Sequence, residues 1–305
     1  MQATVRTSVT FTGAGLHSGT PATIVVRPAV AGHGIWFCRT DVASGDNMIP
    51  AIWHSAEHAA LCTKLVNDDG LYVSTVEHLM AALAGCGIRN ALIDIDGPEV
   101  PILDGSSSPF VKGLLQGGLL KQEAATQAIE ILKTVEVTQG DASARLEPAS
   151  VFSMQFDIEF ADAAIGAQSK SLTLSNGAFV HELANSRTFC RKADVDRMHA
   201  AGLALGGTYD NAIVVDGDTV LSPGGLRHTD EPVRHKMLDA VGDLALAGAP
   251  IIGRYVGHKS GHTLTNKLLH ALFADPSAYR FVDCDSRQSA FLPGAGVTLD
   301  DIASV

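Results

Sequence analysis

The chain has 305 residues, which is long enough for two domains that each bury a core. Hydrophobic residues make up 46% of the chain and charged residues 18%, as in ordinary soluble globular proteins. The formal net charge of −11 argues against nucleic acid as a partner. The five cysteines are scattered and form no Cys-x-x-Cys pair, which argues against a disulfide framework and a thiolate zinc site.

The N-terminal segment lacks the apolar centre of a signal peptide. No apolar run approaches the roughly 20 residues that a membrane-spanning helix needs. We therefore expect a cytoplasmic protein without a transmembrane segment, and we expect it to be a monomer.

The first third of the chain alternates short strands with turns. Strands are predicted at residues 4–12 and 23–27, on either side of a glycine-rich loop at residues 13–19. No Lys-Ser or Lys-Thr pair and no helix follows this loop, which argues against a phosphate-binding P-loop. The next predicted elements are a helix at residues 74–85, a strand at 90–95 and a helix near 110–115.

A polar stretch at residues 117–127 predicts a domain boundary, with an N-terminal domain at residues 1–122 and a C-terminal domain at 127–305. Beyond it, strands are predicted at residues 128–138, 144–146, 153–160, 211–215 and 251–256, with helices at 194–201 and around His235. The order helix, glycine, strand occurs in both halves, which is a faint sign of internal duplication.

The helix around His235 places two candidate metal ligands one turn apart. Asp230 is a candidate N-cap, and Gly248 is a candidate helix end. His235 and Asp239 lie at i and i+4 and can bind the same cation, with Asp243 one turn further on to orient a ligand. The alternative interpretation is a solvated acidic face with an ordinary surface histidine.

Glu77 and His78 stand side by side at the start of the predicted helix at residues 74–85. His78 can supply a third metal ligand, and Glu77 can act as a base toward metal-bound water. Alternatively, Ser74 and Glu77 form a capping box, in which the glutamate only satisfies backbone donors. His78 is then a buried, hydrogen-bonded histidine.

Together, His78, His235 and Asp239 make a set of two histidines and one carboxylate that leaves a coordination position open. Open positions are typical of catalytic metal sites rather than structural ones. His262 lies in a glycine-containing turn at residues 259–262 and is predicted to project from a loop, where catalytic groups are common.

Nine pieces of the chain resemble the zinc-dependent UDP-3-O-acyl-N-acetylglucosamine deacetylases, the LpxC family, which commit Gram-negative bacteria to lipid A biosynthesis. The pieces run in the family's order across nearly the whole chain. They are residues 13–19, 61–63, 74–78, 104–106, 186–189, 206–207, 212–215, 235–239 and 259–262.

The resemblance implies an α+β fold of two domains with similar topology. Each domain is expected to be a layered β-sheet packed against paired α-helices, with the active site between the domains. Inserted elements in each domain are expected to shape that site, and in the second half this role falls to residues 188–215.

The resemblance also implies a reaction, the hydrolysis of the acetamide of UDP-3-O-(3-hydroxyacyl)-N-acetylglucosamine with release of acetate. His78, His235 and Asp239 are implied to bind one zinc ion per chain, with iron as an alternative occupant in the cell. Glu77 is implied to be the general base.

Three further residues receive roles from the resemblance. The Thr188 hydroxyl and protonated His262 are implied to stabilise the tetrahedral oxyanion. His262 is also implied to protonate the leaving amine, and Asp243 to orient His262 or a metal ligand.

Substrate binding is implied for residues near both ends of the substrate. Lys236 is implied to meet the nucleotide diphosphate, and Lys259, Arg187 and Lys267 are further candidates for a local basic patch. Phe160 is implied to stack on uracil. The family's passage for the acyl chain is matched by Leu61, Cys62, Phe189, Leu203, Gly207, Thr208 and Ala212. Arg191 and Ala204 depart from the commoner pattern, which leaves the acyl-chain length open.

Two other classes of function remain open from the residues alone. The ligand set also suits a non-haem iron oxygenase, although such triads normally use a short His-x-Asp pair on a β-barrel. The third class is a non-catalytic binding module for a metal or a sugar nucleotide, which predicts tolerance to substitution at Glu77 and His262.

Overall fold

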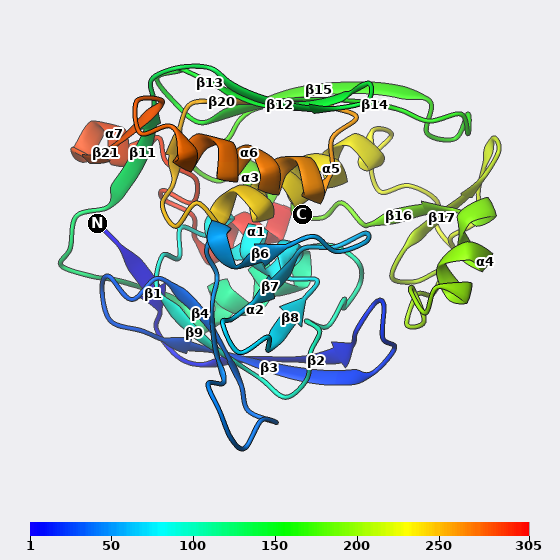
Figure 1. Ribbon diagram of the computed structural model, residues 1–305, viewed down its shortest axis with the longest axis horizontal. Helices are drawn as coiled ribbons and strands as arrows, with labels where there is room; N and C mark the ends of the chain where they lie inside the picture. Colours follow the sequence, from blue (N-terminus) through cyan, green and yellow to red (C-terminus); the bar gives the residue numbers. More distant parts are fainter. Residues whose placement is uncertain (305) are drawn as a thin grey trace.

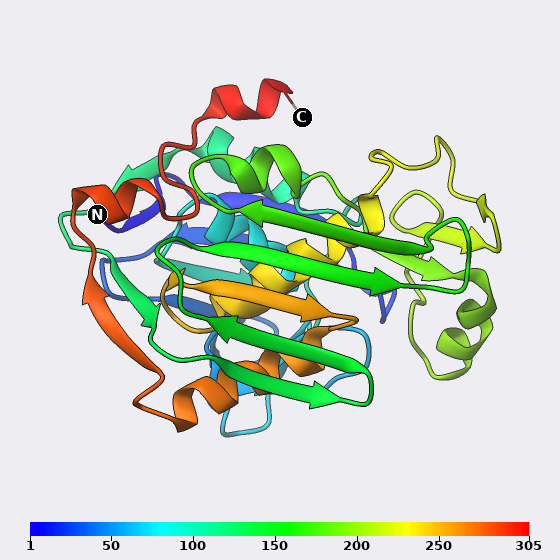
Figure 2. The ribbon, with the colours of Figure 1, turned by 90° about the horizontal axis from the view of Figure 1, so that it is seen from above.

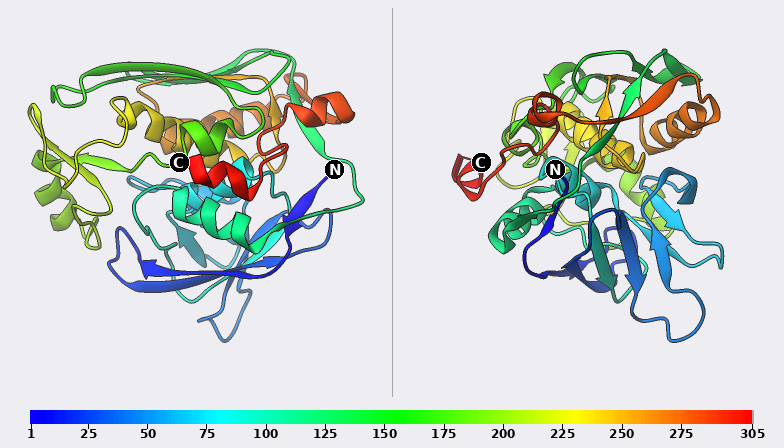
Figure 3. Two further views of the ribbon diagram at one scale, coloured as in Figure 1. Left: turned by 180° about the vertical axis from the view of Figure 1, so that it is seen from behind. Right: turned by 90° about the vertical axis from the view of Figure 1, so that its left-hand side faces the viewer.

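Two five-stranded sheets form the outer layers of the structure, a computed structural model that describes residues 1–304, and the main helices lie between them (Figure 1). The views in Figure 3 show the same order of sheet, helices and sheet. One hydrophobic cluster of buried residues from both halves of the chain fills the space between the sheets. The predicted α+β fold class is confirmed.

The first sheet has the order β2-β3-β9-β4-β5, in which β9 and β4 are parallel and all other neighbours are antiparallel. Alternate residues of β9 are buried while those between them are partly exposed, as expected for a sheet with one covered face. The strands are β2 (Val9–Ala14), β3 (Pro21–Pro28), β4 (Ile35–Arg39), β5 (Met48–Pro50) and β9 (Ala91–Ile95).

The second sheet, seen face-on in Figure 2, has the order β12-β13-β20-β14-β15. Its strand pairs have the same order of parallel and antiparallel pairing as those of the first sheet, with β20 and β14 parallel and the other pairs antiparallel. The faint sign of duplication in the sequence therefore has a structural counterpart. The strands are β12 (Val135–Gln139), β13 (Ala142–Glu147), β14 (Ser153–Glu159), β15 (Ala167–Thr173) and β20 (Arg254–His258).

The helices between the sheets come in matching pairs, α1 (Glu77–Gly85) and α2 (Ser108–Gly117) from the first half, α5 (Glu231–Ala245) and α6 (His262–Ala274) from the second. α1 and α5 pack directly on each other across the boundary between the halves. They approach closely at Gly242, where an added Cβ would lie 2.0 Å from the Glu77 carbonyl oxygen. Only glycine allows this approach.

Each half of the chain also contains a small sheet whose strands all come from that half. β1 (Ala3–Val5) pairs with β10 (Leu119–Lys121), and β11 (Gln127–Ile131) pairs with β19 (Ile251–Ile252) and β21 (Tyr279–Asp283). Within residues 1–304, no strand pairing joins the part before residue 122 to the part after residue 127. This pattern supports our proposal of a domain boundary between those residues.

Each half also carries an inserted sheet. In the first half a short 3-10 helix (Trp53–Ser55) leads into β6 (Ala56–Glu57), β7 (Lys64–Val66) and β8 (Tyr72–Ser74). In the second half β16 (Phe189–Arg191), α4 (Lys192–Ala200), β17 (Ile213–Asp216) and β18 (Thr219–Val220) stand at one end of the molecule (Figure 1). The remaining helices are α3 (Ala178–Glu182), α7 (Ser286–Ala290) and a 3-10 turn (Leu299–Ser304).

Several predicted boundaries were wrong. The predicted strand at residues 4–12 is interrupted, because β1 ends at Val5 and β2 begins at Val9. The predicted strand at residues 128–138 is two strands, β11 and β12, which belong to different sheets. α5 ends at Ala245, before Gly248. Asp230 is the N-cap residue of α5, as predicted, but its side chain makes no cap bond, because its carboxylate pairs with Arg234 and Lys170.

The described helices include none that is both long and apolar enough to span a membrane.

Candidate metal centre and active site

Two helices from different halves bring the three predicted metal ligands together. His78 is the second residue of α1, and His235 and Asp239 lie one turn apart in α5. The Oδ1 atom of Asp239 lies 3.5 Å from Nε2 of His78 and 3.2 Å from Nε2 of His235. Two ligand atoms that each lie about 2.1 Å from a tetrahedral ion stand about 3.4 Å apart. The three atoms therefore fit around one ion.

The protonation states of these buried ligands also suit a cation. Burial lowers the pKa of His235 to about 4, so its imidazole is neutral and offers a lone pair. Burial alone would raise the pKa of Asp239, but His235, Lys236 and His262 hold it well below its usual range. Within the described residues, Oδ1 of Asp239 has no hydrogen-bond partner. A buried anionic oxygen in that position is costly unless a cation binds it.

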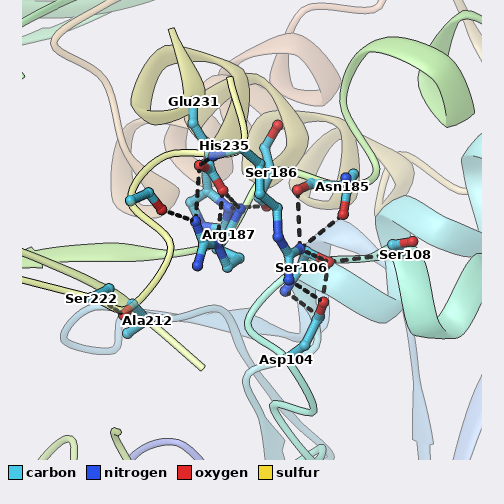
Figure 4. Close-up of polar contacts among 12 residues, drawn as sticks. Asp104, Ser106, Ser108, Asn185, Ser186, Arg187, Ala212, Ser222, Glu231 and His235 are labelled. Atoms are coloured by element: carbon cyan, nitrogen blue, oxygen red, sulfur yellow. Dashed lines mark hydrogen bonds and ion pairs between the residues drawn. The ribbon is translucent and has the colours of Figure 1, made fainter. Parts of the chain in front are cut away.

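A network at the start of α5 orients His235 (Figure 4). Nδ1 of His235 lies 3.0 Å from the Ser186 carbonyl oxygen, which leaves Nε2 as the nitrogen available to an ion. Arg187 binds Glu231, one turn before His235, through its backbone N–H and its guanidinium. Arg187 is therefore not the free cation expected of a diphosphate-binding patch. The alternative of a solvated acidic face is wrong, because the residues at every fourth position are all buried: Glu231, His235, Asp239 and Asp243.

Glu77 is the first residue of α1, and its carboxylate is turned toward the ligands rather than toward the helix backbone. Its Oε2 accepts a hydrogen bond from the Thr63 backbone N–H at 3.0 Å. Ser74 ends β8, where its hydroxyl donates to the Pro98 carbonyl. The predicted capping box is therefore wrong, because Thr75 adopts a φ of +57° and separates the strand from the helix. Burial raises the pKa of Glu77.

His262 faces Glu77 and Asp239 from the start of α6. The prediction that it projects from a loop was wrong, because α6 begins at His262 itself. Its Nε2 lies 3.7 Å from Oε1 of Glu77 and 3.9 Å from Oδ2 of Asp239, and its Nδ1 lies 3.0 Å from Oδ2 of Asp243. Burial opposes the charged form, but Asp243, Glu77 and Asp239 raise the pKa of His262 to about 9.

Thr63 was not predicted as a site residue, yet it links two of the predicted carboxylates. Besides its N–H bond to Glu77, its hydroxyl donates to Oδ1 of Asp243 at 2.5 Å. Thr63 is fully buried. The only sequence signal was that Thr63 falls in the matched piece at residues 61–63, because no pattern within that segment reveals partners so distant in the chain.

Lys236 is partly buried beside the centre, and its side chain points at a candidate metal ligand. Its Nζ donates to Oδ2 of Asp239 at 2.9 Å. Burial disfavours its charge, but Asp239 raises the pKa of Lys236 above its ordinary value. The other lysines of the expected basic patch lie elsewhere. Lys259 pairs with Asp141 and Glu159, and Lys267 donates to Gln139.

The inserted sheet of the second half brings further predicted residues to the ligands. The backbone N–H of Thr188 donates to the Gly105 carbonyl at 2.8 Å, and its carbonyl accepts from Ile213 at 2.8 Å. The Phe189 ring lies edge-on to the His235 ring with centroids 6.3 Å apart. The same Phe189 ring lies 5.4 Å from the ring of Phe160.

The remaining residues of the expected acyl passage differ in how deeply they are buried. Cys62 is buried, and burial raises the pKa of its thiol to about 12, so it is not a thiolate. Leu61 is 57% exposed. In the second half Ala212 is buried, Leu203 is partly buried, and Gly207 and Thr208 are exposed.

A loop of the second-half insert packs on the glycine-rich loop of the first half. The backbone N–H groups of Leu205 and Gly206 donate to the carbonyls of His17 and Leu16. A Cβ on Gly206 would lie 2.2 Å from the Gly15 carbonyl oxygen. The glycine-rich loop therefore serves as a packing surface for the insert. This structural role agrees with the sequence, which has no P-loop signature for phosphate binding at this loop.

The family model for UDP-3-O-acyl N-acetylglycosamine deacetylase matches residues 2–274. A UDP-3-O-acyl-N-acetylglucosamine deacetylase of Pasteurella multocida is 46% identical over 290 residues, which cover 94% of this chain and 95% of that protein. The enzyme of the same name from Phenylobacterium zucineum is 48% identical over 279 residues, or 92% of this chain and 95% of that protein. The Haemophilus influenzae enzyme of this name is 46% identical over 289 residues, or 94% of each chain. This chain therefore belongs to the UDP-3-O-acyl N-acetylglycosamine deacetylase family.

Proposed function

We propose that the protein hydrolyses the acetamide of UDP-3-O-(3-hydroxyacyl)-N-acetylglucosamine, with release of acetate, as the committed step of lipid A biosynthesis. The observation that carries the proposal is the placement of a buried candidate base, a partly buried candidate acid and a buried set of candidate metal ligands within a few ångströms of one another. Family membership supports the choice of substrate.

His78, His235 and Asp239 would hold the metal, for which we propose zinc, with iron as an alternative in the cell. Two nitrogens and one carboxylate oxygen suit zinc and leave a position open. The bound ion would polarise the acetamide carbonyl and lower the pKa of a water molecule beside it.

Glu77 would act as the general base that accepts the proton of the attacking water. Its Oε2 is held by Thr63, while its Oε1 faces the centre near His262. The raised pKa of Glu77 strengthens it as a base, because a more basic carboxylate binds the transferred proton more firmly.

His262 would enter the reaction protonated, because three carboxylates raise its pKa to about 9. Asp243 accepts a hydrogen bond from Nδ1–H of His262 and holds the ring, so Nε2–H can stabilise the developing oxyanion and donate its proton to the leaving amine. Thr188 would add a hydroxyl donor to the oxyanion from the insert.

The substrate would extend from the centre in two directions. We propose that Lys236 attracts the diphosphate and that Phe160 stacks on uracil. The acyl chain would pass along Leu61, Cys62, Phe189, Leu203, Gly207, Thr208 and Ala212. We propose a monomer working in the cytoplasm, where a nucleotide-linked substrate stays in solution.

The decisive measurement is acetate release from UDP-3-O-acyl-N-acetylglucosamine by the purified protein, with and without a zinc chelator. We expect release that the chelator abolishes and added zinc restores. UDP-N-acetylglucosamine is the matched control, and it should react orders of magnitude more slowly because each buried methylene contributes about 0.8 kcal/mol.

The same assay separates the other two classes of function. Oxygen-dependent turnover of the iron-loaded protein would favour an oxygenase. Binding of the sugar nucleotide without acetate release would favour a non-catalytic module. Glu77 and His262, which face each other at the centre, have no evident task in either alternative.

A further inference from the structure

A cavity of about 330 Å³ lies between the two halves of the chain, lined by the later turns of α1 and α5. Its volume falls at the small end of the range of about 300 to 1,000 Å³ that is usual for small-molecule sites. Apolar side chains make up most of the wall, among them Ile35, Trp36, Met80, Leu83, Phe152, Val241 and Leu244.

The cavity and the metal centre use opposite faces of the same two helices. Met80 lines the cavity and stands two residues after His78, and Val241 lines it two residues after Asp239. Two residues along an α-helix correspond to a rotation of about 200°. A molecule in the cavity would therefore contact α1 and α5 without reaching the metal ligands.

One charged side chain, Arg89, forms part of the cavity wall. Within residues 1–304 its guanidinium makes one hydrogen bond, to the Pro293 carbonyl at 3.3 Å, and it makes no ion pair. An arginine carries five N–H donors, so most of its capacity is unused. Burial lowers the pKa of Arg89 to about 10, which still leaves it cationic at neutral pH.

The two arginines that are fully buried in the described chain are neutralised. Arg39 binds Asp41 through two hydrogen bonds, and Arg187 binds Glu231. Arg89 differs from both because no carboxylate faces it within the described chain. A cation that faces an apolar cavity complements a ligand with one negative group and a hydrocarbon body.

We propose that this cavity is a second ligand site, which takes an amphiphilic carboxylate with its head on Arg89 and its hydrocarbon chain between α1 and α5. The hydrocarbon would cover the apolar wall, and the carboxylate would accept the unused N–H donors of Arg89. The site is separate from the one proposed for the reaction, and its occupation does not depend on the metal.

The chain offers a direct reporter for such binding. It has two tryptophans, Trp36 in the cavity wall and Trp53, which stacks on Phe273. In a Trp53→Phe background, Trp36 is the sole source of tryptophan fluorescence. We expect dodecanoate, titrated below its micelle concentration into the zinc-loaded protein, to change this fluorescence with saturation.

Removal of the charge tests the role of Arg89. Arg89→Gln should weaken dodecanoate binding about 10-fold or more, because hydrogen bonds to charged groups contribute about that factor. Arg89→Lys should retain part of the affinity. Arg280→Gln is the matched control and should leave the affinity for dodecanoate unchanged, because Arg280 is exposed and pairs with Glu130.

Two further measurements use the hydrocarbon part of the ligand. 1-Dodecanol should bind the parent and Arg89→Gln equally, and acetate should not bind detectably. Ala84→Leu, which narrows the cavity from its helical wall, should weaken dodecanoate binding while the unfolding temperature stays close to that of the parent.

Three outcomes would overturn the proposal. One is equal affinity of dodecanoate for the parent and Arg89→Gln. Another is competition between dodecanoate and the sugar-nucleotide substrate, which would place the fatty chain in the reaction site. The third is a Trp36 signal that Ala84→Leu leaves unchanged.

Discussion

Glu77 is held away from its own helix backbone by Thr63, the residue just before β7 of the inserted sheet. The Thr63 backbone N–H binds one carboxylate oxygen and leaves the other directed at His262. A capping glutamate would instead bind a backbone N–H at the start of α1, and no side-chain cap bond forms there. At the scale of the residue, these contacts favour a role in proton transfer over a role in capping.

Glu77→Gln tests that role with almost no change of shape. The amide cannot accept a proton, so we expect turnover to fall about 10²-fold to 10⁴-fold while the zinc content stays at the wild-type level. Acetate release and elemental analysis measure the two quantities. Glu57→Gln, in the exposed part of the same inserted sheet, is the control. Near-normal turnover in Glu77→Gln with zinc bound would leave the proposed mechanism without a base.

The alkaline side of the pH profile should depend on Asp243. Three carboxylates, with Asp243 the strongest contributor, raise the pKa of His262 to about 9, so activity that needs protonated His262 is lost as the pH rises through this value. Asp243→Asn should move the alkaline limb to lower pH. An unmoved limb at full zinc content would assign it to another group, because coupled sites titrate together.

The same pKa shift affects stability with a defined sign. The folded-state pKa of His262 lies above its ordinary value of 6.5, so protonated His262 stabilises the folded state below that pH. This contribution disappears as the pH rises through about 9.

At the scale of elements, the packing of α1 on α5 depends on Gly242. An added Cβ there would lie 2.0 Å from the carbonyl oxygen of Glu77, the candidate base. Alanine favours a helix by about 1 kcal/mol over glycine, but a clash with backbone cannot be relieved by a side-chain rotation.

We therefore expect Gly242→Ala to lower the free energy of unfolding by about 1 to 3 kcal/mol and to reduce turnover as well. Urea denaturation and acetate release measure the two effects. Gly97→Ala is the matched control, because a Cβ at Gly97 would meet Ala22 at an ordinary 3.8 Å. A Gly242→Ala variant with an increased free energy of unfolding would contradict this prediction. It would mean that α1 and α5 can move apart at little cost to accommodate the methyl group.

The helices α1, α2, α4 and α5 and many of the strands could be predicted from the sequence because their periodicity is local, whereas α3, α6, α7 and the short strands of the inserted sheets were mostly not predicted. The spacing of His235 and Asp239 is likewise local, so their shared ligand role was visible in the sequence. The supports of the site were not visible, because Ser186 binds His235 across 49 positions and Thr63 binds Asp243 across 180. The alternative of a capping box does not hold either, because Thr75 with its φ of +57° separates Ser74 from α1 and the Thr63 N–H binds Glu77 instead.

At the scale of the whole molecule, the proposed metal site draws its ligands from both halves. His78 comes from the first half, and His235 and Asp239 come from the second. A ligand that binds only the folded state stabilises it, by about 2.7 kcal/mol when its concentration is 100 times its dissociation constant. Zinc should therefore hold the two halves together as well as support the reaction.

Removal of the metal should lower the unfolding temperature by several degrees, as followed by calorimetry with and without chelator. His78→Ala is the control, because a protein that has lost a ligand from the first half should respond far less to the chelator. If the unfolding temperature of the parent stayed constant after proven loss of zinc, the metal would not couple the halves.

The repeated sheet order has a consequence for a chain cut between residues 122 and 127. Each piece would keep a complete five-stranded sheet, but Glu77 and His78 would leave with one piece, and His235, Asp239 and His262 with the other. The short connection now keeps the two sets at a high effective concentration. Once the connection is cut, the site can form only when the two fragments associate. Its formation then depends on the protein concentration and is lost on dilution.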